Sequence, residues 1–279
     1  MTPLRQRFVE DLRLRQYATR TQYQYVQCIE HYVEFFGKPV EELGLEDVRT
    51  FLLYLVTEAE TSFGLLRHYV SALRFLYRVT LGMPWSVEQI PFPRREHHLP
   101  WIPTREEIMK LLDAVPNIKH RAALMTCYAA GLRVAEVVAL RLSDIDSDRM
   151  LLFVHDGKRR KDRMVPLSKT LLDFLRGYWK AVRPTDWLFP GRYGHHLSKR
   201  VVQTACLQAR RRSGIKHPLT VHSLRHAFAT HLYEAGTNLR SLQMVLGHAS
   251  LQTTSIYMHV SPKEIQKITS PLDLPTTTT

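Results

Sequence analysis

Apolar residues recur at helical spacing along almost the whole of this 279-residue chain. Within residues 63–79, for example, they fall three or four positions apart, which places them on one face of a helix. One stretch reads differently: residues 151–155 and 163–167 are short apolar runs, and the Asp156-Gly157 pair between them is a hairpin turn signal. The sequence therefore predicts a mainly α protein with a small β-sheet.

Residues 91–103, PFPRREHHLPWIP, contain four prolines, which disfavour a helix and favour an extended chain. We interpret this run as a linker. It separates a helical N-terminal domain, residues 1–90, from a second domain, residues 104–270, and residues 271–279 form a flexible tail that ends in threonines.

Several helix boundaries can be predicted. Thr19 is a candidate N-cap for a helix that ends at Gly37. Thr104 and Glu107 form a capping box at the start of the second domain. A later helix is expected over residues 197–212.

The chain is strongly basic. It has 39 Lys and Arg against 26 Asp and Glu, which gives a net charge of +13. Such a surface attracts polyanions, most often nucleic acid, although a basic protein without that role is the simpler interpretation of charge alone. Arg94 and Arg95 make the linker a basic strap that could lie along DNA, and the adjacent His97 and His98 lack a further ligand for a metal.

Other functional classes find little support. No segment approaches the length of apolar residues that a membrane span needs, and the charged N-terminus lacks a signal-peptide core. The three cysteines, Cys28, Cys127 and Cys206, are far apart and odd in number, which favours a reducing cytoplasm over a disulfide framework. A cytoplasmic location, at the nucleoid, is therefore expected.

Residues 222–257 concentrate the side chains that could carry chemistry. His222, Arg225 and His226 share one face of a predicted helix, because positions three and four apart lie over one another. A second short helix ends before His248, and Tyr257 follows nine positions later.

These groups suit phosphoryl transfer. A guanidinium matches phosphate oxygens, an imidazole can donate or move a proton, and a tyrosine hydroxyl can attack phosphorus. The simpler interpretation is that Tyr257 is one of 12 tyrosines and packs against a helix.

The spacing of the motifs resembles that of the tyrosine recombinases, the phage-integrase and Xer-like family. The family pattern has His-x-x-Arg, then Leu-Gly-His, then Tyr nine residues after that His, and this chain matches it at His222, Arg225, His248 and Tyr257. Residues 131–137, GLRVAEV, match the earlier Gly-Leu-Arg-x-x-Glu-hydrophobic motif. The resemblance implies a helical, SAM-like core-binding domain that clamps DNA together with a C-terminal catalytic domain.

The resemblance also implies roles for the matched residues. Arg133 and Arg225 would grip the scissile phosphate, and Glu136 would orient them from behind. His222 and His248 would donate or shuttle protons while the tyrosine attacks, leaving a 3′-phosphotyrosyl bond.

The hairpin GKRRKDRMVPL, residues 157–167, is similar to the family's lysine hairpin. The resemblance makes Lys158 the general acid, with Lys161 as its competitor, and gives Arg159 and Arg160 backbone contacts. A solvated basic turn is the simpler interpretation.

Trp187-Leu188-Phe189-Pro190 resembles the hydrophobic anchor that precedes the family's DNA-facing helix. Candidate DNA contacts on that helix are Lys199, Arg200, Arg210 and Arg211. The implied partners are double-stranded DNA with paired, inverted-repeat sites and further copies of the chain, as a tetramer on two sites. The segment after Tyr257 is short, so docking between copies would use Ile265, Ile268 and Leu272.

Three alternatives stay open. A type IB topoisomerase shares the Arg, Lys, His and Tyr chemistry, and a catalytically inactive relative would bind DNA alone. A zinc site on His222 and His226 lacks a third ligand and the His-Glu-x-x-His pattern. The filled catalytic positions favour a recombinase that needs no metal or other cofactor.

Overall fold

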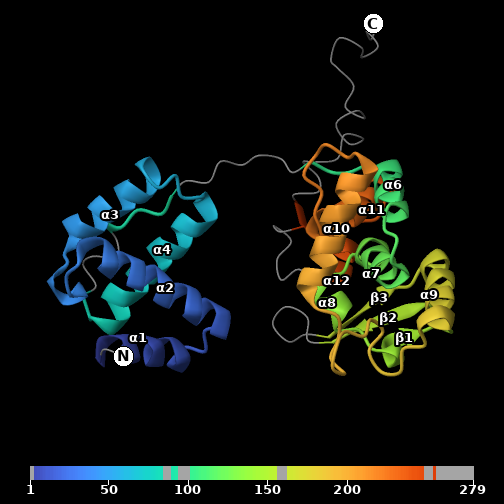
Figure 1. The fold of residues 1–279 in the computed structure, drawn as a ribbon, viewed down its shortest axis with the longest axis horizontal. Coiled ribbons are helices and arrows are strands. Elements are labelled where there is room, and N and C mark those ends of the chain that lie inside the picture. The colour runs from blue at the N-terminus through green and yellow to red at the C-terminus, as the bar shows by residue number, and fades with distance from the viewer. Residues whose placement is uncertain (1–2, 84–88, 94–100, 156–161, 248–253, 256–279) are drawn as a thin grey trace, which may run out of the picture. The chain divides into compact units, whose positions relative to one another are not determined.

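The computed structural model describes residues 3–83, 89–93, 101–155, 162–247 and 254–255 (Figure 1). The chain divides into two compact units, Met1–His97 and His98–Thr279. Both consist mainly of helices, and the second contains a three-stranded sheet, which confirms the predicted fold class. Among the helices of the described ranges, none is both long and apolar enough to cross a membrane.

The first unit packs its helices around an aromatic core. Its elements are α1 (Pro3–Leu14), α2 (Thr19–Phe36), η1 (Val40–Glu42), α3 (Leu45–Thr57), α4 (Phe63–Phe75) and η2 (Leu76–Thr80). The ring of Phe51 lies at the centre, with centroids 5.1 Å from Tyr32 and 5.6 Å from Tyr69. Tyr77 donates a hydrogen bond to the main-chain oxygen of Leu43 at 2.8 Å, and its hydroxyl lies 3.1 Å from that of Tyr32. The two buried phenols are thus satisfied within the core.

Two boundaries predicted for this unit are wrong. Thr19 is the first residue of α2, and the N-cap is Ala18, whose extended backbone makes no side-chain cap. The helix predicted over residues 63–79 ends at Phe75 and continues as a π-helical turn, η2. That wider turn keeps Leu76 and Tyr77 buried, which a uniform helical period does not reveal.

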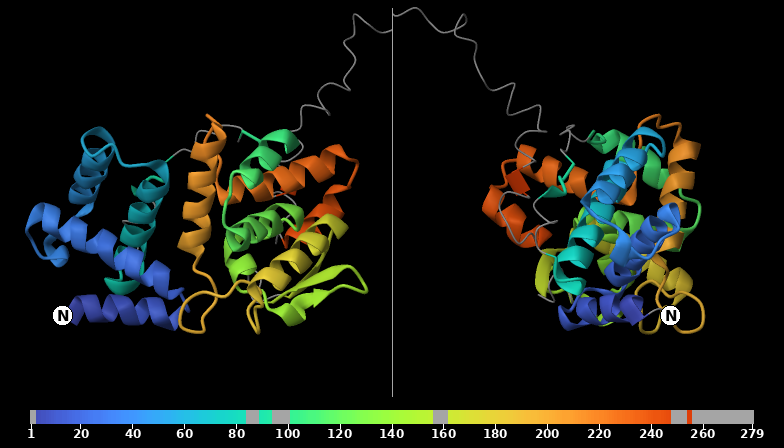
Figure 2. Two further views of the ribbon diagram at one scale, coloured as in Figure 1. Left: turned by 45° about the vertical axis from the view of Figure 1, so that its right-hand side comes forward. Right: turned by 90° about the vertical axis from the view of Figure 1, so that its left-hand side faces the viewer.

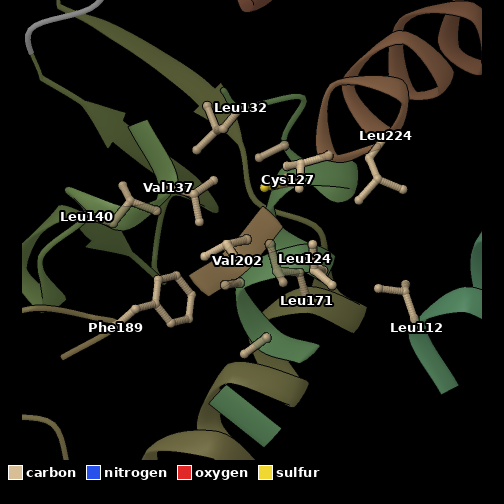
Figure 3. Close-up of a cluster of buried hydrophobic side chains, with 14 of the residues drawn as sticks. Leu112, Leu124, Cys127, Leu132, Val137, Leu140, Leu171, Phe189, Val202 and Leu224 are labelled. Carbon is tan, nitrogen blue, oxygen red and sulfur yellow. The ribbon is translucent and has the colours of Figure 1, made fainter. Parts of the chain in front are cut away.

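The second unit is built around helix α7 (Ile118–Ala129). Figure 3 shows Cys127 of this helix in the middle of an apolar cluster with Leu124, Val202 and Leu224, and all four side chains are fully buried. The surrounding helices are α6 (Arg105–Asp113), α8 (Val134–Val138), η3 (Leu142–Asp144), α9 (Lys169–Val182), α10 (Lys199–Ser213), α11 (Val221–Glu234) and α12 (Leu239–Leu246).

Polar N-caps fix where the helices of this unit begin. Thr104 accepts a hydrogen bond from the N–H of Glu107 at 3.2 Å, and the Glu107 carboxylate accepts one from the N–H of Thr104 at 2.9 Å. The predicted capping box is therefore confirmed. Side-chain caps also begin α7, α9, α10, α11 and α12, at Asn117, Ser168, Ser198, Thr220 and Asn238.

The sheet lies beside α9, as Figure 2 shows. Its strands are antiparallel in the order β1 (Ile145–Asp146), β2 (Leu151–Val154), β3 (Arg163–Pro166). In its register Leu152 faces Val165, and Val154 faces Arg163. The two predicted strands and their pairing are confirmed, while their turn, residues 156–161, lies outside the described residues. Strand β1 is too short to show an alternating pattern in the sequence.

Helix α10 begins later than predicted, because Leu197 is not part of it. The N–H of Leu197 instead donates to the main-chain oxygen of Phe189 at 2.8 Å, and Ser198 caps the helix. Leu188 and Phe189 are buried, so this segment attaches the start of α10 to the core.

Both described ends of residues 91–103 are held by their own unit. The Arg74 guanidinium lies 4.2 Å from the centroid of the Phe92 ring in the first unit. In the second unit, Trp101 stacks on His217 with ring centroids 4.5 Å apart.

Candidate active site

Four predicted site residues, Arg133, Glu136, His222 and Arg225, lie within the described part of the second unit, and the structure brings them together. The other predicted catalytic residues and several predicted DNA contacts fall outside the described residues, so their roles stay predictions: Arg94, Arg95, Lys158, Arg159, Arg160, Lys161, His248 and Tyr257.

Glu136 is the centre of the site. It lies on α8, and only 7% of its side chain is exposed. Its carboxylate accepts hydrogen bonds at 2.8 Å from both the main-chain N–H and the Nη1 of Arg133, the N-cap residue of α8. A second guanidinium nitrogen, Nη1 of Arg225, lies 3.6 Å away. Glu136 thus contacts both arginines of the predicted phosphate clamp.

Arg225 is part of the core, with 2% of its side chain exposed. It lies on helix α11, and its guanidinium reaches the C-terminal ends of two other helices. It donates to the main-chain oxygen of Gly131, just after α7, at 2.7 Å and to that of Leu246, the last residue of α12. Gly131 joins α7 to α8 with a φ of +61°, and a Cβ at this position would lie 2.3 Å from the Phe228 ring. The glycine therefore lets the chain approach α11 closely enough for its carbonyl to meet Arg225.

A third arginine, Arg163, completes the site, although it is absent from the residues that the sequence predicts for it. It begins β3, and its guanidinium forms a fork on Glu136, with N–O distances of 2.8 and 3.0 Å. Its Nε donates to the main-chain oxygen of Val245 at 2.8 Å. The strand period could have indicated it, because Arg163 lies on the same face as the buried Val165 and a buried charge requires a partner.

The cluster carries a net positive charge. Three guanidiniums surround one carboxylate, and 3 − 1 = +2. Burial alone would raise the pKa of Glu136, but hydrogen bonds from Arg163 and Arg133 outweigh it and lower the pKa to about 2. Glu136 therefore stays ionised near neutral pH, and the excess charge suits an anion such as a phosphate.

Two histidines lie beside the arginines on α11. The rings of His222 and His226 have centroids 4.4 Å apart at 79°. Partial loss of solvation and the nearby Arg225 and Arg133 lower the pKa of His222, although the residue as a whole is exposed. Burial, His222 and Arg225 lower the pKa of His226 to about 4. Both rings are therefore neutral near pH 7, and a neutral imidazole can accept a proton.

Helix α10 presents the predicted DNA contacts on its outer side. Lys199, Arg200 and Arg211 are exposed and Arg210 is half-buried, while Val202 on the opposite side is buried. Across the described ranges, no three His, Cys, Asp or Glu side chains gather as a metal ion would require.

Comparison with known proteins assigns the family. Residues 103–264 match the phage integrase family, and residues 4–87 match the N-terminal SAM-like domain of phage integrases. The chain belongs to the phage integrase family. It is a tyrosine recombinase, an enzyme of site-specific DNA recombination, as the resemblance implied.

Named relatives span nearly the whole chain. An integrase/recombinase of Sinorhizobium fredii is 44% identical over 276 residues, which cover 98% of this chain and 90% of the relative. The tyrosine recombinase XerA of Thermococcus kodakarensis is 34% identical over 87% of this chain and 86% of its own length.

Solved structures show the same fold. The crystal structure of XerA recombinase matches with a TM-score of 0.56 and 25% identity, over 94% of this chain and 95% of that one. A lambda integrase dimer bound to a COC′ core site has a TM-score of 0.76 at 20% identity, over 98% of this chain and 79% of that one. The latter likeness concerns the fold alone.

Proposed function

We propose that this phage integrase family member cuts and rejoins DNA strands through a 3′-phosphotyrosyl intermediate, with Tyr257 as the nucleophile. The observation that carries the proposal is the buried Glu136, which holds Arg133 and Arg225 side by side next to His222. Donors fixed before the phosphate arrives stabilise the charge that develops on its oxygens, without reorganising during the reaction.

The two arginines are expected to act differently. Arg133 is 28% exposed, so its guanidinium is free to reach a non-bridging phosphate oxygen. Arg225 is buried and already donates to two main-chain oxygens, but a guanidinium has five N–H donors. Its fixed positive charge would act on the phosphate from inside the core.

Protons balance in the proposed step. The Tyr257 oxygen forms a bond to phosphorus in line with the P–O5′ bond, which breaks. His222 accepts the phenol proton, because its lowered pKa leaves it neutral near pH 7. Lys158, with Lys161 as the alternative, protonates the leaving O5′, and His248 donates a hydrogen bond to a phosphate oxygen. The phosphotyrosyl ester keeps the energy of the broken bond, so a 5′ hydroxyl can reverse the step without ATP.

The proposed partner is double-stranded DNA, held between a core-binding domain at residues 1–90 and a catalytic domain at residues 104–270. The exposed basic side of α10 would contact the DNA, together with the basic residues of the linker and hairpin. Paired inverted-repeat sites and a tetramer are part of the proposal. Among solved relatives, a lambda integrase tetramer is bound to a Holliday junction, and XerH is bound to a palindromic difH substrate. Its place of action would be the nucleoid, in the cytoplasm.

Nicked duplexes made from the DNA that flanks the gene would test the chemistry. Each is incubated with the wild-type chain or with Tyr257→Phe, and denaturing gels detect protein joined to a 3′ end. The wild type should form the adduct at one position. Tyr257→Phe should form none while shifting the same duplexes in a native gel, because only the nucleophilic oxygen is removed.

An adduct that persists in Tyr257→Phe would refute the assignment of the nucleophile. Relaxation of supercoiled plasmid at equal rates with and without the bound duplex sequence would indicate a type IB topoisomerase instead. Binding by both proteins without any adduct would indicate a DNA-binding relative that lacks the activity.

A further inference from the structure

Arg163 makes more bonds to Glu136 than are needed to hold the two arginines of the predicted phosphate clamp. Glu136 already has Arg133 at 2.8 Å and Arg225 at 3.6 Å, yet Arg163 adds a two-point fork to the same carboxylate. Its side chain is 10% exposed, so its guanidinium is shielded from solvent and is less available to a phosphate than that of Arg133.

The position of Arg163 in the chain suggests what the fork is for. It is the first residue of β3, where it pairs with Val154, the last residue of β2. Residues 155–162 connect these two positions along the chain, and Lys158 is one of them. Contacts that hold Arg163 in place therefore also hold the end of the segment that contains Lys158.

The partners of Arg163 belong to the phosphate-binding part of the site. The fork connects β3 to α8, whose N-cap residue is Arg133. The Nε bond to Val245 connects β3 to the end of α12, and a Cβ at the following Gly247 would lie 3.1 Å from the Arg163 side chain. A planar fork with three directional bonds sets distance and angle together, which a single ammonium does not.

We propose that Arg163 is a positioning residue, which holds the base of the lysine hairpin at a fixed place relative to the Arg133–Glu136 pair. Lys158 then reaches the leaving O5′ of a phosphate that the arginines hold. This inference rests on the proposed function, in which Lys158 is the general acid.

A sulfur substitution separates this role from a merely structural one. A duplex is made with sulfur in place of the bridging 5′ oxygen, at the cleavage position that the wild type marks on the nicked duplexes. A thiol has a pKa of about 8.5, so a thiolate leaves without a proton, whereas an alkoxide is much more basic and needs the general acid.

Arg163→Gln should form the covalent adduct about 100-fold more slowly than wild type on the normal duplex, because small misplacement of a catalytic group has costs of that order. On the sulfur duplex its rate should come within about fivefold of wild type, because the misplaced acid is no longer required. Arg163→Lys keeps the charge without the fork, and it should show the same pattern with a smaller loss.

Matched controls define the outcomes. Arg141→Gln removes another arginine that pairs with a carboxylate at 2.8 Å, on Asp186, and should change neither rate. Equal losses for Arg163→Gln on both duplexes, with native-like melting and DNA shifts, would overturn the positioning role. So would a fully active Arg163→Lys, because charge alone would then suffice.

Lys158→Ala distinguishes a failure of the underlying mechanism. It should lose adduct formation on the normal duplex and regain it on the sulfur duplex. If Lys158→Ala gains nothing from sulfur, Lys158 is not the acid, and the proposed function fails at that step. If Lys158→Ala is rescued and Arg163→Gln is not, only the positioning inference fails.

Discussion

At the scale of single residues, the site combines a carboxylate that stays charged with imidazoles that stay neutral. Hydrogen bonds from Arg163 and Arg133 lower the pKa of Glu136 to about 2, while burial, His222 and Arg225 lower that of His226 to about 4. Both shifts favour the folded state near neutral pH. Both therefore make the second unit sensitive to acid, although over different ranges.

The histidine range can be measured separately. A histidine whose folded pKa is about 4 binds its proton more readily in the unfolded chain, where the pKa is 6.5. Its contribution to stability is complete above pH 6.5 and declines as pH falls towards 4, by up to about 3 kcal/mol. His226→Gln should remove this part of the decrease in the free energy of unfolding with falling pH. Urea titrations at several pH values between 7 and 4 would show the difference. If the free energy of unfolding depends on pH in the variant as it does in the wild type, the lowered pKa of His226 is contradicted.

Residues also show what the sequence can predict. Arg133, Glu136, Arg225 and His222 each stand in a motif with fixed spacing, so they could be predicted, and the structure brings them together. Arg163 could not be assigned so easily, because its partners lie 27 and 82 positions away in the chain. Such contacts follow from the tertiary packing of β3 against α8 and α12, which local periodicity does not encode.

At the scale of elements, the junction between α7 and α8 decides the geometry of the site. Gly131 has a left-handed φ of +61°, and its missing side chain makes room for the Phe228 ring. Its carbonyl holds Arg225. Gly131 therefore both allows the close packing of Phe228 and holds Arg225 of the predicted phosphate clamp.

Gly131→Ala should lower the free energy of unfolding by about 2–4 kcal/mol, because the methyl group adds both backbone strain and a steric clash. Denaturant titration measures it. Gly177→Ala is the matched control, because Gly177 lies within α9 and a Cβ there meets nothing within 4 Å. That variant should be unchanged or slightly stabilised. Equal destabilisation of both variants would exclude the clash as the cause.

Element boundaries were less predictable than element types. The two strands of residues 151–155 and 163–167 and the capping box at Thr104 follow directly from local pattern. The π-helical turn at Leu76–Thr80 and the two-residue strand β1 do not. Each depends on tertiary contacts that hold a short segment in a conformation its own residues do not dictate.

At the scale of the whole molecule, the net charge of +13 should dominate DNA affinity. Neutralised phosphates release counterions, so binding weakens steeply as salt rises. The total charge attracts DNA of any sequence, but only basic residues that lie close to the bound DNA should affect the affinity strongly.

Replacing Lys199, Arg200 and Arg211 with Gln should weaken binding to every duplex. The slope of log binding constant against log salt concentration should become smaller by about 1 for each phosphate that is no longer neutralised. Gel shifts at several salt concentrations measure it. A variant with Arg149, Arg176 and Lys180 replaced by Gln removes the same exposed charge from the β1–β2 turn and α9. If both variants reduce the slope equally, α10 is not the DNA-facing helix.

The way α10 is attached has a consequence for how such enzymes diversify. Its inward stripe of Val202, Ala205, Cys206 and Ala209 is buried, whereas its outward positions are exposed. The Glu136 cluster is built from β3, α8, α11 and the end of α12. If α10 faces DNA as proposed, selection can rewrite its outer side one substitution at a time, and a lineage would then move to new DNA targets while the reaction it inherits stays intact.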